Sequence, residues 1–174
     1  DNQEELGAGM MDNVDYNSSC YYIYASLDVD KLRDNLKNAE NPEALVKVVI
    51  PSLLRTMAYS NPSGKQNSFA GNVLPSAVLV EGKEYPVPVS YANAFAKPAK
   101  ATMKADLVAD SITKLQQHVV ATAKAFPSLA DANRVWFNVS GAAEKDEVFC
   151  DSLGVQAAHD YDELITKVSA FLQK

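Results

Sequence analysis

The groups best suited to binding chemistry lie in a polar loop, residues 61–71, with the sequence N-P-S-G-K-Q-N-S-F-A-G. Proline and glycine interrupt regular structure here, and asparagine and serine hydrogen-bond the local backbone. Lys65 supplies a cation, and Gln66 and Asn67 supply amides beside exposed backbone N–H groups. These groups could hold a polyanion or a nucleotide, although an ordinary surface connection would have the same composition.

Three further lysines recur at intervals of three and four residues, at Lys97, Lys100 and Lys104. If they surround the start of a helix, they project from one side of it, where each could neutralise a phosphate and make binding salt-dependent. The alternative is a solvated helix face. Tyrosines 21, 22 and 24 could stack bases, but packing in a core is the favoured interpretation for most of them.

The charge of the chain is unevenly distributed. Its net charge of −6 alone argues against nucleic acid as a partner. Residues 1–30, however, hold seven acids and no lysine or arginine, whereas residues 55–124 hold eight basic residues and four acids. Because salt screens charges beyond about 10 Å at 0.1 M, a local basic surface can bind a phosphate backbone on an acidic protein.

Catalytic and metal-binding patterns are weak. The two histidines, His118 and His159, have no second histidine at metal-ligand spacing, and Cys20 and Cys150 form no zinc motif. Gly64-Lys65 lacks the preceding glycine and the following serine or threonine of a phosphate loop. The sequence therefore predicts no catalytic residue, no metal site and no cofactor.

Hydrophobic periodicity and turn signals predict the elements that would position these groups. The predicted strands are 18–27, 77–80, 85–91 and 134–139, with a turn at Gly82-Lys83; the predicted helices are 28–38, 42–58, 104–126 and one from Asp160 to the end. The order is β-α-β-β-α-β plus a terminal helix. This order predicts an α+β, ferredoxin-like or RNA-recognition-motif-like antiparallel sheet with helices on one face. Residues 1–17 are predicted to form a mobile arm, and residues 18–174 the domain.

The bulk properties agree with a single domain of ordinary composition at 174 residues. No run of 18 apolar residues is present, so no membrane span is predicted. Unpaired cysteines favour a reducing, cytoplasmic location. The chain begins at Asp1 rather than methionine, which suggests a trimmed or internal piece of a longer product.

Three segments together carry a resemblance to a known family. They are S-S-C-Y-Y-I-Y-A-S-L at 18–27, G-K-Q-N-S-F-A-G-N-V-L-P at 64–75 and S-Y-A-N-A-F-A-K-P-A-K at 90–100. In this order they resemble the C-terminal half of the CasC family, the CRISPR RNA-binding backbone subunits of type I-E Cascade complexes. The similarity covers most of residues 10–174 and weakens after Asp110.

The resemblance implies a non-catalytic subunit that polymerises along a CRISPR RNA, beside copies of itself and other Cascade subunits, and presents the guide to a target DNA strand. Residues 1–17 would be the returning arm of a thumb-like excursion, and the rest a palm-like domain. Lys65 and Gln66 match the family loop and Lys100 matches a backbone-contacting lysine; the next such lysine falls at Thr102, so Lys104 is its substitute. Family members are considerably longer, and the resemblance places their first palm strand outside this chain, whereas the residue pattern alone predicts a self-contained sheet.

Two other functions fit the sequence. One is a ferredoxin-like protein-interaction module that binds no nucleic acid. The other is a guide-processing endoribonuclease that uses His118 or His159 as its base.

Overall fold

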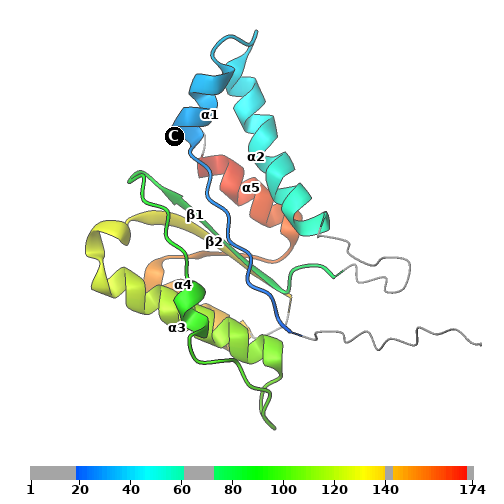
Figure 1. Ribbon diagram of the computed structural model, residues 1–174, viewed down its shortest axis with the longest axis vertical. Helices are drawn as coiled ribbons and strands as arrows, with labels where there is room; N and C mark the ends of the chain where they lie inside the picture. The colour runs from blue at the N-terminus through cyan, green and yellow to red at the C-terminus, as the bar shows by residue number, and fades with distance from the viewer. Residues whose placement is uncertain (1–18, 61–72, 140–142, 172–174) are drawn as a thin grey trace, which may run out of the picture.

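The computed structural model describes residues 19–60, 73–139 and 143–171. Helices lie on both sides of a small central sheet in this part of the chain (Figure 1). The elements are α1 (Val29–Leu36), α2 (Pro42–Tyr59), β1 (Ala77–Lys83), the 3-10 helix η1 (Ala92–Phe95), α3 (Leu107–Ala125), the 3-10 helix η2 (Pro127–Leu129), β2 (Ala132–Asn138), α4 (Ala143–Leu153), β3 (Gln156–Ala158) and α5 (Tyr161–Phe171). None of the helices in these ranges is long and apolar enough to cross a membrane.

The sheet has three strands in the order β1-β2-β3. β1 and β2 pair antiparallel, with Ala77 opposite Asn138 and Lys83 opposite Ala132. β2 and β3 pair parallel, with Val135 opposite Gln156. A parallel pair needs a crossover connection, and α4 supplies it between these two strands.

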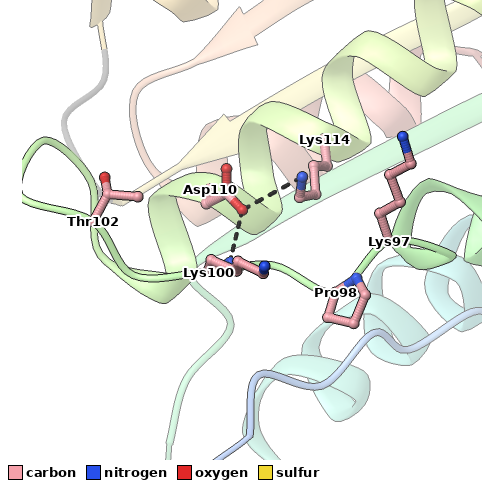
Figure 2. Close-up of a pocket in the computed structure, with 6 residues that line it drawn as sticks. All are labelled: Lys97, Pro98, Lys100, Thr102, Asp110 and Lys114. Carbon is pink, nitrogen blue, oxygen red and sulfur yellow. Dashed lines mark hydrogen bonds and ion pairs between the residues drawn. The ribbon is translucent and has the colours of Figure 1, made fainter.

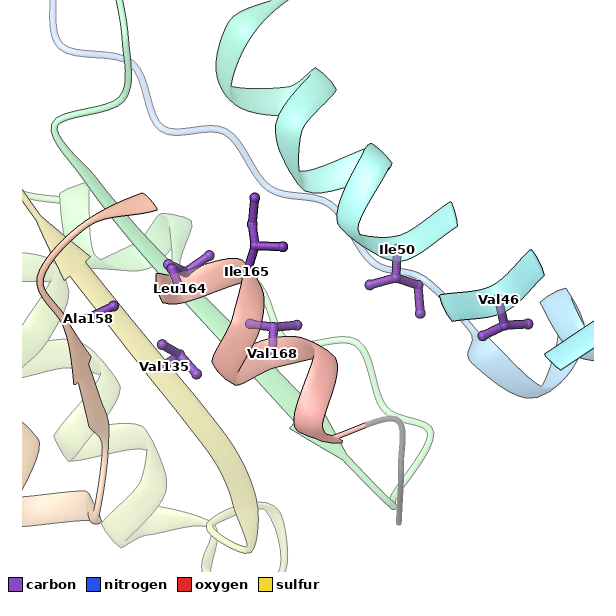
Figure 3. Packing of buried hydrophobic residues seen from close by; sticks show 7 residues of the cluster. All are labelled: Val46, Ile50, Val135, Ala158, Leu164, Ile165 and Val168. Atoms are coloured by element: carbon purple, nitrogen blue, oxygen red, sulfur yellow. The ribbon is translucent and has the colours of Figure 1, made fainter. Parts of the chain in front are cut away.

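Both faces of the sheet are covered, because successive side chains of β2 point to opposite sides. Val135 packs with α2 and α5, in a cluster made of Val46, Ile50, Val135, Ala158, Leu164, Ile165 and Val168 (Figure 3). Trp136, the next residue, packs with α3 and α4 in a second cluster made of Tyr91, Ile112, Val119, Trp136, Phe149, Cys150 and Val155. The core is therefore divided in two by the sheet, and neither face is open.

Local sequence signals explain where the helices begin. A side-chain oxygen before the first turn accepts a backbone N–H three residues later, which satisfies a donor that the helix itself leaves unpaired. This bond is made by Asp28 to Lys31 at 2.9 Å, Asn41 to Ala44 at 3.1 Å, Asp106 to Ala109 at 2.7 Å and Asp160 to Glu163 at 2.7 Å. Pro42, at the first position of α2, adds a pre-set backbone angle.

The predicted α+β class with a ferredoxin-like arrangement is confirmed, and the sheet differs from the prediction in detail. It is mixed rather than fully antiparallel, because β3 runs parallel to β2. Helices cover both faces rather than one. The predicted arm, residues 1–17, lies outside the described residues.

Two predicted strands are wrong. Residues 19–27 of the first take no regular secondary structure and cross the molecule as an extended segment (Figure 1); we call residues 19–28 the strap. Residues 85–91 are also irregular, with Val87 N–H bonded to the Tyr85 carbonyl at 2.8 Å. Pro86 and Pro88 remove the donors that a ladder would need, which explains the second failure.

The structure also contains elements that were not predicted. The acidic segment 144–147, read as a solvated turn, lies within α4, and β3 follows it. Gly154, at φ 61°, joins the two in a left-handed conformation that other residues adopt at a cost. Gly82 and Lys83 lie inside β1 rather than at a turn.

Candidate functional site

A surface pocket of about 410 Å³ lies between the start of α3 and the segment that precedes it. Its lining comes from two stretches of chain and contains three lysines, as Figure 2 shows: Lys97, Pro98, Lys100, Thr102, Asp110 and Lys114. Three lysines and one aspartate leave this lining with a net charge of +2 in a chain of net charge −6. The lining of the pocket is therefore locally positive on an acidic protein.

The sequence of the segment before α3 explains why it is not helical. η1 ends at Phe95, and Pro98 follows shortly after it. Because a proline disfavours helical backbone at the residue before it, the helical turn does not continue through Lys97, and residues 98–100 have no regular secondary structure. A tight turn then closes at Thr102, whose N–H bonds the Ala105 carbonyl at 2.8 Å.

Asp110 joins the two sides of the pocket. It stands in the first turn of α3, where its Oδ2 accepts the backbone N–H of Lys100 at 2.9 Å. The same oxygen lies 3.6 Å from Nζ of Lys114, one turn further along the helix. One carboxylate therefore fixes the backbone of Lys100 and holds the Lys114 ammonium at the pocket (Figure 2).

The other end of the lysine segment is anchored to the sheet through Glu81. Glu81 stands opposite Arg134 in the β1–β2 register, and the Arg134 Nε donates to it at 2.7 Å. The Tyr91 hydroxyl lies 3.1 and 3.0 Å from the two Glu81 oxygens, and Nζ of Lys83 lies 3.0 Å from Oε2. We call these four residues the Glu81 cluster. Tyr91 immediately precedes η1, so the cluster sets where the lysine segment begins.

This anchor is largely buried. Arg134 is 2% exposed, and the side chains of Glu81 and Lys83 are 10% and 12% exposed. Burial raises the pKa of Tyr91 above its ordinary range, and the neighbouring Glu81 charge raises it further. Tyr91 therefore stays a neutral donor to the carboxylate.

The strap lies against the same segment. The backbone N–H of Tyr91 donates to the Tyr22 hydroxyl at 3.0 Å, and the Tyr22 and Phe95 rings lie 5.5 Å apart. Tyr22 is half-buried, while Tyr21 and Tyr24 are 73% and 42% exposed. Of these three tyrosines, Tyr22 is the one that packs against a core cluster.

The predicted binding residues separate into three groups. Lys97 and Lys100 come together at the pocket, and no carboxylate of the described residues forms an ion pair with either ammonium. Lys104 does not line the pocket, because α3 begins at Leu107 and leaves it in the exposed turn at Thr102. The three loop residues, Lys65, Gln66 and Asn67, lie outside the described residues.

Lys114 lines the pocket although the sequence did not single it out. A signal was present: it follows Asp110 by four residues on a predicted helix, so both face the same side. Asp110 itself was counted only as one acid among many.

The two histidines lie in different environments. The His118 ring, on α3, packs edge-on against Tyr91 with ring centroids 6.2 Å apart. His159 precedes α5, and its backbone N–H donates to Glu163 at 2.6 Å. This bond, after the stronger one from Lys167, lowers the pKa of Glu163. No cluster of metal-ligating side chains occurs among residues 19–60, 73–139 and 143–171.

Comparison with known proteins gives a family and a fold. The family model described as CT1975-like protein matches residues 1–166. A solved structure described as "CRISPR RNA-guided surveillance complex" is similar with a TM-score of 0.67 and 23% identity, over 83% of this chain and 50% of that one. Another, "CRISPR RNA-guided surveillance complex, pre-nicking", gives 0.67 and 22%, over 83% and 35%. The chain thus spans half or less of the length of these neighbours, and no curated protein matches it.

Proposed function

Because this chain belongs to the CT1975-like protein family, we propose that it is a non-catalytic, CRISPR RNA-binding backbone piece of a Cascade surveillance complex. It would lie along the guide RNA beside copies of itself and other subunits, and hold the guide for pairing with a target DNA strand. The solved structures of similar fold are described as CRISPR RNA-guided surveillance complexes, which supports this proposal.

The observation that carries the proposal is the convergence of Lys97, Lys100 and Lys114 on one pocket. Their ammonium groups come from two segments that the Asp110 carboxylate ties together. Ammonium groups on flexible stems bind phosphate as point charges and read no base, so the pocket suits a guide of any sequence. One such pocket binds weakly, and repetition of the subunit along a strand would multiply the affinity.

The covered sheet changes where the RNA would lie. RNA-recognition domains bind bases on an open sheet face, and here helices pack against both faces. The RNA would therefore follow the α3 side of the molecule, at the edge where the pocket opens, rather than the sheet.

Salt-dependent binding tests the proposal. Fluorescence anisotropy would measure the affinity of the protein for a labelled single-stranded RNA at several salt concentrations, for the wild type and for Lys100→Gln/Lys114→Gln. Each lost phosphate contact should flatten the slope of log K against log salt by about 0.7, so the double variant should lose about 1.4.

A matched control is Lys47→Gln, an exposed lysine on α2, the helix that packs on the opposite face of the sheet. Its slope should equal that of the wild type. An unchanged slope in the double variant would overturn the site. No binding to RNA at low salt would overturn the function and favour a protein-interaction module.

A further inference from the structure

Asp110 is out of place in a pocket that binds phosphate. Its carboxylate stands among three lysines and should weaken the attraction for a polyanion. It is not the cap of α3, since Asp106 makes that bond to Ala109. Both of its contacts at the pocket, to Lys100 and to Lys114, use Oδ2. Oδ1 has no hydrogen bond to any residue that the structure describes.

No other side chain of the pocket offers an open acceptor. The lysines are donors only, and Pro98 has no polar side-chain group. The Thr102 hydroxyl is engaged in its own turn: it accepts N–H groups from Lys104 and Ala105, each at 3.2 Å, and lies 3.5 Å from the Ala105 carbonyl. Asp110, with 29% of its side chain exposed, is the side-chain acceptor that a ligand in this pocket would meet.

The ion pair between Asp110 and Lys114 is long enough for Lys114 to exchange the carboxylate for a phosphate. The distance of 3.6 Å exceeds that of a direct charge-assisted hydrogen bond. When a phosphate enters, the Lys114 ammonium can turn toward it. The Asp110 carboxylate then lies beside the bound nucleic acid without the Lys114 charge close to it. A ligand with a hydroxyl next to its phosphate would compensate for that loss, and a ligand without one would not.

We propose that Asp110 is a specificity-determining residue that accepts a hydrogen bond from a ribose 2′-hydroxyl next to the bound phosphate, and so makes the pocket prefer RNA to DNA. This deepens the proposed function and rests on it. The 2′-hydroxyl is the group that distinguishes RNA from DNA at a given site. With deoxyribose, the carboxylate would face a polyanion with no donor, which costs affinity.

The experiment compares three oligonucleotides of one sequence: RNA, DNA and 2′-fluoro RNA. The fluoro sugar keeps the ribose pucker but donates no hydrogen bond, so it separates hydrogen bonding from backbone shape. The wild-type protein should bind RNA roughly tenfold more tightly than either analogue, the size expected of one partly exposed charge-assisted bond.

Two variants locate the effect. Asp110→Asn keeps an oxygen for the Lys100 N–H and removes the charge, and Asp110→Ala removes the acceptor altogether; circular dichroism would check that both are folded. In both variants the preference for RNA should shrink, to near one in Asp110→Ala. DNA binding should rise in Asp110→Asn, which loses the charge but keeps the bond to Lys100. Asp30→Asn, on α1, changes the net charge equally on the opposite side of the sheet and should leave the ratio unchanged.

The outcomes separate this inference from the proposed function. Equal wild-type affinity for RNA and 2′-fluoro RNA, or an RNA-to-DNA ratio unaffected by Asp110→Ala, would overturn the role of Asp110 while leaving RNA binding intact. Failure of the wild type to bind RNA at low salt would overturn the proposed function itself.

Discussion

The Glu81 cluster should be the most sensitive part of the core to a single change of charge. Glu81 accepts from Arg134 at 2.7 Å, lies 3.0 Å from Nζ of Lys83 and holds the Tyr91 hydroxyl. The substitution Glu81→Gln keeps the shape and one acceptor oxygen but removes the negative charge. Two nearly buried cations, Lys83 and Arg134, then lose the negative charge that Glu81 supplies.

The structure sets the size of the effect. Removing one partner of a buried ion pair costs about 3–5 kcal/mol, because the other charge stays desolvated. Arg134 keeps its bond to the Ala130 carbonyl at 2.9 Å, which favours the lower end of this range. With a urea m-value of about 2 kcal/mol/M, a loss of about 3 kcal/mol lowers the unfolding midpoint by about 1.5 M. Arg134→Met should cost less than Glu81→Gln, since Lys83 still balances Glu81.

Urea unfolding can be followed through Trp136, the single tryptophan, which is 2% exposed and packs on the same side of the sheet. Far-ultraviolet circular dichroism gives a second probe of whether the transition is two-state. The double variant Glu81→Gln/Arg134→Met should be more stable than the sum of the single losses implies. The control, Asp162→Asn, breaks an exposed pair with Arg55 and should cost less than about 1 kcal/mol. Additive losses, or a Glu81→Gln loss no larger than that of the control, would refute the reasoning.

Three further predictions follow from neighbouring contacts. The pKa of Tyr91 is higher in the folded state than in the unfolded state, where it is about 10. The contribution of Tyr91 to the free energy of unfolding is therefore complete below about pH 10 and declines as the pH rises above that value. Tyr91→Phe should make the stability measured by urea unfolding less sensitive to pH between about 10 and 11. Tyr22→Phe leaves the Tyr91 N–H without its acceptor and should lower the free energy of unfolding by about 1–3 kcal/mol in the same assay. The lysine segment should then be held less firmly, and the proposed RNA binding should weaken in fluorescence anisotropy. Unchanged stability together with unchanged binding would contradict the anchoring role of Tyr22. A Cβ at Gly82 would stand 3.0 Å from the Phe171 ring, so Gly82→Val should lower stability by about 1–3 kcal/mol through overpacking, and a stability gain in thermal unfolding would contradict that contact.

Local sequence signals predicted α1, α2, α3 and α5, missed α4 and predicted the strands poorly. Each predicted N-cap acts within four residues of chain, so its effect could be read directly, as with Asn41 and Asp160. Strand formation depends instead on a partner. The aromatic run of the strap has strong β-propensity, yet no neighbouring strand pairs with it among the described residues, and Tyr22 packs through its ring and hydroxyl instead.

The sequence pointed to Lys97 and Lys100 but not to the way in which the structure positions them. The interval between Lys97 and Lys100 suggested a helix face, but Pro98 prevents the helix, and the two lysines meet at a pocket because Asp110 holds the Lys100 backbone. That contact joins residues ten positions apart through a tertiary fold. Lys114 joins the site through its i,i+4 pairing with the same carboxylate, a local signal that a search for lysines alone does not detect.

Counting charges along the chain also could not tell which cations are available to a ligand. Residues 55–124 hold twice as many basic residues as acids. In the structure, Lys83 is bound to Glu81 inside the fold and Arg55 pairs with Asp162 on α5. Lys100 meets Asp110 through its backbone instead, so its ammonium remains available. Because one acid can either cancel a lysine's charge or only position its backbone, the binding potential of a basic segment depends on which atom the carboxylate contacts.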